Sequence, residues 1–570
     1  MSMTKGAFMT ENQYPWYESY PEDVPHTIGE PEYDSLYALF EDKCHKYANK
    51  TAFTSFGTSM TFREVNEKVD AFASYLQNEL HVKKGDALGV ILPNLIQYPI
   101  CVFAGLKCGM RIVNVNPLYT AHEILSVLRD SKAQVVVTLE SINARLLQIH
   151  DQTYIKTIIS CNVGDYLGSF KGAFYNFAFR YIKRSVPSYD KKQIVSFKNA
   201  VEKGYNLGFS KVDINIDDVA FYQYTGGTTG KPKGAMLTHR NIISNVMQAD
   251  AMYSPILNYG EETILTALPL YHIFAMTINL MFALYIGCSN ILIADPRQFN
   301  TVISALKRNS DVSIIIAVNT LLNAFVTHDV FKKVKLNKLR LVVGGGTAVQ
   351  EGVAKKFKEV SGVSVLEGYG LTECSPLCCA LPYNNREYNG TIGVPTPSTI
   401  ARIVDIHTGE EITQKNMPGE LEFKGPQVMK GYFNNQKETE HVFDGEFLRT
   451  GDIAVWCEGG FIKIIDRIKD MIIVSGFNVF PNEIENVVSM LNGVIECGVV
   501  GVPSSSTGES VKLYIVRKDK TLTKELVLLH LKKYLTGYKI PKHIEFVEKL
   551  PKSPVGKVLR RYLRQNRFDS

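Results

Sequence analysis

"YTGGTTGKPKG" occupies residues 224–234, directly after "DDVAFYQ" and directly before "AMLTHRN". Four glycines, three threonines and two lysines fill these eleven residues, so the stretch has almost nothing to bury in a core. Glycine allows a close approach of the backbone to a ligand, and threonine and lysine side chains supply hydrogen-bond donors. The stretch predicts a loop whose backbone wraps an anion.

Spacing separates this loop from two better-known phosphate-binding loops. A Walker A loop is excluded because the second glycine, Gly230, comes one position early and Pro232 stands where Ser or Thr should follow Lys231. The G-x-G-x-x-G fingerprint of dinucleotide-binding folds does not match either. A different phosphate clamp, built from glycine amides, threonine hydroxyls and a lysine, and a solvated hairpin without a ligand both stay open.

The composition describes a large globular protein. A chain of 570 residues predicts more than one domain, and a net charge of +6 without long charged blocks gives no reason to expect nucleic acid as a partner. The ten cysteines contain no C-x-x-C pair, which favours reduced thiols. The N-terminus has no apolar signal-peptide core, and we expect residues 264–293 to form a buried strand–helix–strand unit, not a membrane span.

Strand-like apolar runs alternate with amphipathic helical segments along most of the chain. This alternation predicts an α/β fold with largely parallel sheets. The predicted strands are 87–93, 111–116, 133–139, 313–318 and 339–346, and the clearest predicted helices are 63–80 and 117–131. The last hundred or so residues form a separate pattern of short strands and helices, which predicts a small α+β domain. We place an N-terminal tail at 1–30, the large domain at 31–466, a hinge at 467–469 and a small mobile C-terminal domain at 470–570.

The loop and six further segments resemble the AMP-binding adenylate-forming superfamily. Every position of "YTGGTTGKPKG" matches the superfamily signature, and the other segments follow in the family order: "LPLYHIF" (268–274), "VGGGTAV" (343–349), "EGYGLTECSP" (367–376), "TGDIA" (450–454), "DRIKDMIIVSGFNVFPNEIE" (466–485) and "PKSPVGKVLRR" (551–561). The match spans roughly residues 30–565 and is most similar to bacterial long-chain fatty acid–CoA ligases.

The resemblance implies an ATP site. Its residues would be Tyr224, Thr225, Gly226, Gly227, Thr228, Thr229, Gly230, Lys233, Gly344, Gly345, Gly346, Tyr369, Gly370, Thr372, Asp452, Arg467 and Lys557. The loop would hold the β- and γ-phosphates, Tyr369 would stack on adenine, and Asp452 and Arg467 would bind the ribose. Glu373 would bind Mg²⁺ together with Thr225, since hard cations prefer oxygen ligands.

The resemblance also implies an acyl pocket and a moving domain. His272, Met276 and Asn319 would line the acyl pocket, within the apolar segments 272–284 and 314–326. Some long-chain family members carry a gating Trp at the position of Met276, so this sequence puts a Trp gate in doubt. Lys557 would bridge the carboxylate and the α-phosphate, as a compact charge on a long stem.

Rotation about Lys469 would withdraw Lys557 and bring Gly476 and Phe477 to the path of CoA. The implied reaction is ATP-dependent activation of a long-chain fatty acid to acyl-AMP, followed by transfer to CoA. The alternatives are a fatty acyl-AMP ligase and a medium-chain or aromatic acid–CoA ligase. Only fourteen residues separate Asp452 from Arg467, so the insertion that acyl-AMP ligases tend to carry near this boundary is not apparent. The expected partners are fatty acid, ATP and CoA, and the expected location is the cytoplasm. A homodimer is compatible with the resemblance.

One segment raises the question of peripheral contact with the cytoplasmic membrane. Phe170, Phe174, Phe177 and Tyr181 follow the spacing i, i+4, i+7, i+11, which predicts an aromatic stripe on one helix face. Lys171, Arg180, Lys183 and Arg184 lie beside or opposite this stripe. A helix lying on an anionic membrane and a helix packed on the domain through its aromatic face both fit the pattern.

Overall fold

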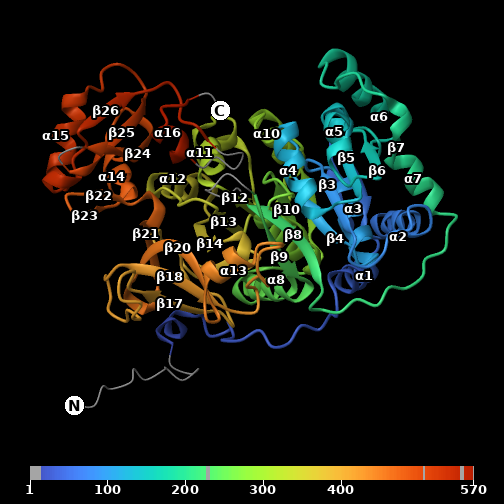
Figure 1. Cartoon of the computed structure of the whole chain (residues 1–570), viewed down its shortest axis with the longest axis horizontal. Helices are drawn as coiled ribbons and strands as arrows, with labels where there is room; N and C mark the ends of the chain where they lie inside the picture. Colours follow the sequence, from blue (N-terminus) through green and yellow to red (C-terminus); the bar gives the residue numbers. More distant parts are fainter. Residues whose placement is uncertain (1–13, 226–231, 505–506, 553–557, 569–570) are drawn as a thin grey trace.

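A computed structural model describes residues 14–225, 232–504, 507–552 and 558–568. A large N-terminal domain and a smaller C-terminal domain lie side by side, and helix α6 projects at the opposite end of the molecule from the small domain (Figure 1). The fold class predicted from the sequence is confirmed, because two sheets of the large domain are mostly parallel and are interleaved with helices.

The first sheet of the large domain has seven strands in the order β7-β6-β5-β3-β4-β8-β9. All neighbours run parallel except β8 and β9. The strands are β3 (Ala87–Ile91), β4 (Arg111–Asn114), β5 (Val135–Leu139), β6 (Thr157–Cys161), β7 (Ile194–Ser196), β8 (Val219–Thr225) and β9 (Lys233–Thr238). Strands β3 and β5 are buried at every position, as expected where helices cover both faces of a parallel sheet.

The second sheet has nine strands in the order β16-β15-β14-β13-β12-β10-β11-β1-β2, with a parallel centre and antiparallel edges. Its strands are β1 (Thr51–Ser55), β2 (Thr58–Thr61), β10 (Thr263–Thr266), β11 (Ser289–Leu292), β12 (Ile314–Ala317), β13 (Leu341–Gly345), β14 (Val365–Gly370), β15 (Leu377–Ala380) and β16 (Val394–Pro395). The strand–helix–strand unit predicted for 264–293 is confirmed. A buried π-helix, η7 (Ala275–Phe282), and the short α9 (Ala283–Tyr285) follow β10 and precede β11 along the chain.

Helices precede or connect the strands of the large domain. They are α1 (Leu36–Lys46), α2 (Phe62–Asn78), α3 (Gln97–Lys107), α4 (Ala121–Ser131), α5 (Asn143–Ile149), α6 (Ser169–Phe177), α7 (Phe197–Gly204), α8 (His239–Tyr253), α10 (Phe299–Arg308), α11 (Asn319–Thr327), α12 (Glu351–Ser361) and α13 (Gln436–Val442). Helix α4 begins four residues later than predicted, because Thr120 accepts from the Glu123 amide and the Glu123 carboxylate accepts from Thr120, forming a capping box. Helix α2 begins in the same way at Thr61.

An antiparallel third sheet leads from the large domain to the small one. It consists of β17 (Ile400–Val404), β18 (Gly419–Lys424), β19 (Phe443–Asp444), β20 (Phe447–Trp456) and β21 (Ile462–Arg467). Part of the predicted N-terminal tail packs here: Trp16, in a 3₁₀ turn η1 (Pro15–Ser19), is buried and stacks on Trp456 of β20.

The small domain has its own sheet and its own core. The sheet contains β22 (Ile472–Val474), β23 (Phe477–Val479), β24 (Val494–Ser504), β25 (Gly508–Arg517) and β26 (His543–Phe546). Helices α14 (Pro481–Ser489), α15 (Lys524–Tyr534) and α16 (Arg560–Arg564) accompany it. A 3₁₀ turn, η11 (Ile468–Asp470), joins β21 to β22 and so connects the two domains.

Candidate active site

Three neighbouring parallel strands bring predicted site residues to one edge of the nine-stranded sheet. Asn319 follows β12, Gly345 ends β13, and Gly370 ends β14. The carboxyl ends of parallel strands meet at the same edge, which is where α/β folds bind ligands. This edge therefore collects the residues predicted for adenine and the acyl group.

The glycines at the end of β13 allow close packing there. A Cβ on Gly345 would lie 2.9 Å from the Phe274 ring and from the carbonyl oxygen of Gly368, and Gly346 has a φ of +74°. Gly344 pairs with Glu367 of β14. The Glu367 side chain accepts a hydrogen bond from the amide of Val349 (2.8 Å), and burial raises its pKa to about 7. Glu367 thus supports the loop after β13, a role that the sequence did not single out.

Strands β8 and β9 hold the two ends of the glycine- and threonine-rich loop. Tyr224 pairs with Gly234, and Thr225 with Lys233. The Tyr224 hydroxyl donates to Oδ2 of Asp130 (2.5 Å), and burial, with the nearby carboxylate, raises its pKa. The strand register is therefore fixed on both sides of the loop. The five predicted residues between these ends, Gly226, Gly227, Thr228, Thr229 and Gly230, lie outside the described residues.

A short segment, residues 429–433, connects the base of this loop with Glu373. Its backbone bonds to β9: the Phe433 amide donates to Gly234 (2.8 Å), and the Met236 amide donates to Gly431 (2.9 Å). At its other side, the Tyr432 hydroxyl donates to Oε1 of Glu373 (2.6 Å). Glu373 lies in the 3₁₀ turn η9 (Thr372–Cys374) that follows β14. Tyr432 therefore fixes one carboxylate oxygen of Glu373, and among the described residues no protein group donates to Oε2.

Lys233 also contacts Tyr432. Its ammonium lies over the Tyr432 ring, 5.4 Å from the ring centre, and pairs with the carboxylate of Glu438 in α13. Tyr432 thus contacts a positive group with its ring and a negative group, Glu373, with its hydroxyl. Such a pair suits a ligand that carries both phosphate and a divalent cation.

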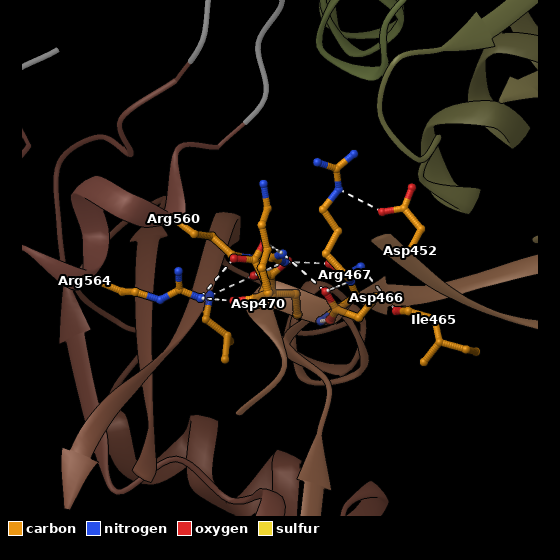
Figure 2. Close-up of polar contacts among 11 residues, drawn as sticks. Asp452, Ile465, Asp466, Arg467, Asp470, Arg560 and Arg564 are labelled. Carbon is orange, nitrogen blue, oxygen red and sulfur yellow. Dashed lines mark hydrogen bonds and ion pairs between the residues drawn. The ribbon is translucent and has the colours of Figure 1, made fainter. Parts of the chain in front are cut away.

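Asp452 is the centre of a second polar group. It is 3% exposed, its Oδ2 accepts from the Tyr369 hydroxyl (2.5 Å), and its Oδ1 is 2.9 Å from Nε of Arg467. Figure 2 shows the Arg467 side chain extending from β21 to Asp452. The Asp452 carboxylate raises the pKa of Arg467. Oδ1 of Asp452 is buried and accepts no hydrogen bond of good geometry from the described residues, so its contact with Arg467 is that of an ion pair.

Met276 lies in the first turn of the buried π-helix, and His272 lies three residues before its start. Nδ1 of His272 accepts from the Phe274 amide (3.3 Å), and desolvation lowers the pKa of His272 to about 4. The imidazole is therefore neutral at neutral pH and can act as a hydrogen-bonding group without charge. Met276 is buried, and its sulfur accepts from Nδ2 of Asn114 (3.5 Å). Of the predicted acyl-lining segment 314–326, residues 314–317 form a strand, β12, and Oδ1 of Asn319 accepts from the Gln350 amide (3.0 Å).

The predicted hinge and CoA-path residues lie at the start of the small domain. Lys469 lies in η11, where burial and the positive charge of Arg467 lower its pKa. Gly476 has a φ of +84° in the turn between β22 and β23, and Phe477 stacks on Tyr538 at 4.9 Å. Lys557 lies outside the described residues. The described residues that flank it are joined, since Lys552 forms a β-bridge with Val558.

Tyr432, Asp130 and the small-domain residue Arg560 escaped the sequence analysis. Tyr432 is 59 residues from its partner Glu373, and Asp130 is 94 residues from its partner Tyr224. Arg560 is 94 residues from Asp466. A lone tyrosine, aspartate or arginine carries no spacing signal, and Arg560 stands in "PKSPVGKVLRR" (551–561) beside another arginine. Only the fold reveals these contacts.

Comparisons with known proteins identify the family of this chain. Residues 40–433 match the model of the AMP-binding enzyme family, and residues 483–557 match the AMP-binding enzyme C-terminal domain. A long-chain-fatty-acid–CoA ligase of Escherichia coli O6:H1 is 46% identical over 549 residues, which cover 96% of this chain and 97% of that protein. The namesake of Haemophilus influenzae is 42% identical, covering 96% and 98%.

Among solved structures, ATP-bound MatB from Rhodopseudomonas palustris superposes with a TM-score of 0.82. The two proteins are 26% identical, and the match covers 94% of this chain and 99% of MatB. A family match over more than half of the chain and relatives above 40% identity over nearly its full length lead to one conclusion. This chain belongs to the AMP-binding enzyme family.

Proposed function

We propose that this protein is an AMP-forming long-chain fatty acid–CoA ligase. The observation that carries the proposal is the presence of two polar groups in a chain that is 46% identical to curated ligases of that name. The first group contains Tyr369, Asp452 and Arg467. The second group contains Lys233, Glu373 and Tyr432. The first group suits a nucleoside, and the second suits phosphates with a cation.

The reaction proceeds in two steps. A fatty acid carboxylate oxygen attacks the α-phosphorus of ATP, and the bond to the β-phosphate oxygen breaks, which releases pyrophosphate. The sulfur of CoA, after losing its proton, then attacks the acyl carbon and displaces AMP. Both steps bring anionic groups together, so donors and positive charge at the site lower their barriers. Lys233, Arg467 and Lys557 are the cationic side chains that we assign to this task.

Glu373 is our candidate for holding Mg²⁺. No group of three or more His, Cys, Asp or Glu side chains in the described part of the chain is arranged to hold a metal ion. A single carboxylate still fits, because Mg²⁺ is commonly held by one or two carboxylates plus substrate phosphates and water. Tyr432 orients this carboxylate, and partners of this kind typically affect metal affinity about 10- to 100-fold. The Mg²⁺, when bound, would neutralise charge on the phosphates.

Membrane contact through α6 is a second proposal. Helix α6 and the π-helix η4 (Ala178–Ile182) expose Phe170, Phe174, Phe177, Tyr181 and Ile182 to solvent. The opposite face is anchored: the Lys171 ammonium donates to the carbonyl of Phe56, and Arg180 pairs with Glu140. The alternative in which the aromatic stripe packs on its own domain is therefore wrong.

Helix α6 also packs closely on the domain at Gly172. A Cβ on Gly172 would lie 2.3 Å from the carbonyl oxygen of Gly164, so the helix sits directly on the backbone of the domain. Lys183 and Arg184, next to the stripe, are exposed. Exposed aromatic side chains beside basic ones suit an anionic lipid surface. No helix in the described ranges has the length and apolar character to cross a bilayer. The cytoplasmic location and the homodimer stay predictions.

A chain-length series tests the proposed reaction. Octanoate, laurate, palmitate, oleate and benzoate are supplied with ATP and Mg²⁺, and both pyrophosphate release and CoA consumption are followed. Each methylene that the pocket buries contributes roughly 0.8 kcal/mol, so kcat/KM should rise steeply from octanoate to palmitate. A preference for octanoate or benzoate would refute the long-chain assignment, and pyrophosphate release without CoA consumption would indicate an acyl-AMP ligase.

A further inference from the structure

The guanidinium of Arg560, in α16, is surrounded by acidic and amide oxygens. Nη1 lies 3.4 Å from Oδ1 of Asp466 and 3.2 Å from Oδ2 of Asp470. Nη2 donates to both carboxylate oxygens of Glu485 (2.9 Å each) and to Oδ1 of Asn482 (2.6 Å). The Arg560 side chain is only 14% exposed. Figure 2 shows this cluster beside the Asp452–Arg467 pair.

The cluster crosses the boundary between the domains. Asp466 belongs to β21, where it pairs with Ile453 in the antiparallel sheet of the large domain. Asn482 and Glu485 belong to α14 of the small domain. Asp466 is fully buried, and its carboxylate also accepts from the amides of Arg467 and Asn482 (2.7 Å each). One arginine of the small domain therefore binds an aspartate near the end of a large-domain strand.

Asp466 and Asp470 stand on either side of residues 467–469. Both bind Arg560, so this short connection is held at its two ends. Arg564, one turn further along α16, donates to the carbonyl of Lys469 (3.2 Å) and to Oδ1 of Asp470 (2.9 Å). The backbone of Arg467 is therefore fixed from both directions, and its side chain is left to reach Asp452.

We propose that Arg560 is a positioning residue, which acts through Asp466 and Asp470 to aim Arg467 at Asp452. The orientation of the Arg467 side chain towards Asp452 would thus depend on the position of the small domain relative to the large one. This inference rests on the proposed function insofar as Asp452 and Arg467 bind ATP. It adds a residue whose hydrogen-bond partners among the described residues do not include Asp452.

The geometry requires arginine at this position. A planar guanidinium offers five donors in a fixed fork and can serve several acceptors at once. A lysine would keep the charge among the acids but could not bind both carboxylate oxygens of Glu485 while reaching Asp466 and Asp470. Arg560→Lys is therefore the informative variant, since it disturbs the orientation without removing the positive charge from a buried acidic cluster.

The test compares ATP binding in four full-length proteins: wild type, Arg560→Lys, Arg467→Ala and the double variant. Isothermal titration calorimetry gives the Kd for ATP with Mg²⁺, and turnover gives KM values for ATP and palmitate. Arg561→Lys is the matched control, because Arg561 is exposed on the same helix and donates only to the Tyr562 hydroxyl (3.3 Å) among the described contacts. Thermal unfolding is recorded for every protein.

We expect Arg560→Lys to raise the Kd and KM for ATP about tenfold, which is the size expected for losing a hydrogen bond to a charged group. The KM for palmitate should change less than twofold, and Arg561→Lys should behave as wild type. In the Arg467→Ala background the effect of Arg560→Lys should disappear, because there is no side chain left to position.

A purely structural role for Arg560 predicts a different result. Arg560→Lys would then weaken ATP binding equally in both backgrounds, or would raise the KM values for ATP and palmitate in parallel, and either result overturns the inference. Should Arg560→Lys fail to fold, Asp466→Asn serves instead, because it leaves Arg560 bound to Asp470 and Glu485. Absent wild-type turnover would contradict the proposed function separately, since the calorimetric cycle does not depend on turnover.

Discussion

Replacing Phe170 and Phe174 by serine should detach the protein from anionic vesicles. These side chains are 94% and 63% exposed, so together they offer about one and a half fully exposed phenylalanine side chains to a lipid phase. Burying one phenylalanine contributes roughly 1.5–3 kcal/mol, and the pair therefore contributes about 2.4–4.7 kcal/mol to membrane binding. At 1.4 kcal/mol per factor of ten, the double variant should bind about 50- to 2000-fold more weakly.

Co-sedimentation with vesicles of phosphatidylglycerol and phosphatidylcholine measures this partition. Tyr154→Ser is the matched control, because Tyr154 is 54% exposed and lies outside α6 and η4. Activity towards octanoate, added as a soluble substrate, shows whether the site of the variant remains intact. Binding of the double variant that stays within threefold of the wild type would refute the reasoning, as would equal loss in Tyr154→Ser. Binding to neutral vesicles alone would reject the role of Lys183 and Arg184.

Three further predictions concern the site and its support. Lys557→Ala should slow oleate-dependent pyrophosphate release by about 10²–10³-fold yet still transfer preformed acyl-AMP to CoA; unchanged pyrophosphate release would remove Lys557 from the adenylation step. His239 is buried, accepts from the Leu36 amide (3.1 Å), and has a pKa lowered by burial to about 4. Because its folded-state pKa lies below the unfolded value, stability is lost as pH falls from about 6.5 to 4, by roughly 3 kcal/mol. His239→Gln should flatten the pH dependence of the unfolding midpoint in that window, and an equally steep profile would contradict this account. Tyr369→Phe should lower stability by roughly 1.5–3 kcal/mol, because Oδ2 of Asp452 loses its donor in a buried place; urea unfolding should show no such loss when Asp452→Ala is already present, because the acceptor is then absent.

The sequence could predict much of the α/β core because its signals are local. Continuous apolar runs such as 87–93 and 133–139 have enough hydrophobic side chains for both faces of a strand, and both became central parallel strands. The predicted start of α4 is four residues too early, because the capping box of Thr120 and Glu123 begins the helix at Ala121. Boundaries depend on single side chains, whereas the type of an element depends on many.

The candidate site was predictable only where its residues stand in a motif. Asp452, Arg467, Tyr369 and Glu373 belong to such motifs, and the fold brings Asp452, Arg467 and Tyr369 into one polar group. Tyr432 belongs to none, yet its hydroxyl determines how Glu373 is oriented. A contact between residues far apart in sequence depends on how strands and turns pack, and no local pattern encodes it.

The aromatic stripe shows what the sequence alone determined. Spacing established that Phe170, Phe174, Phe177 and Tyr181 share one face of a helix, since this follows from 3.6 residues per turn. Whether that face meets the core or the solvent depended on the other side of the helix. There the Gly164–Gly172 backbone contact and the Arg180–Glu140 pair hold the helix down. The tertiary structure likewise decided that Arg560, one basic residue among several in its segment, is the one that binds the acids of the domain boundary. Periodicity follows from chain geometry, but burial and charge pairing exist only between parts of the chain that folding has brought together.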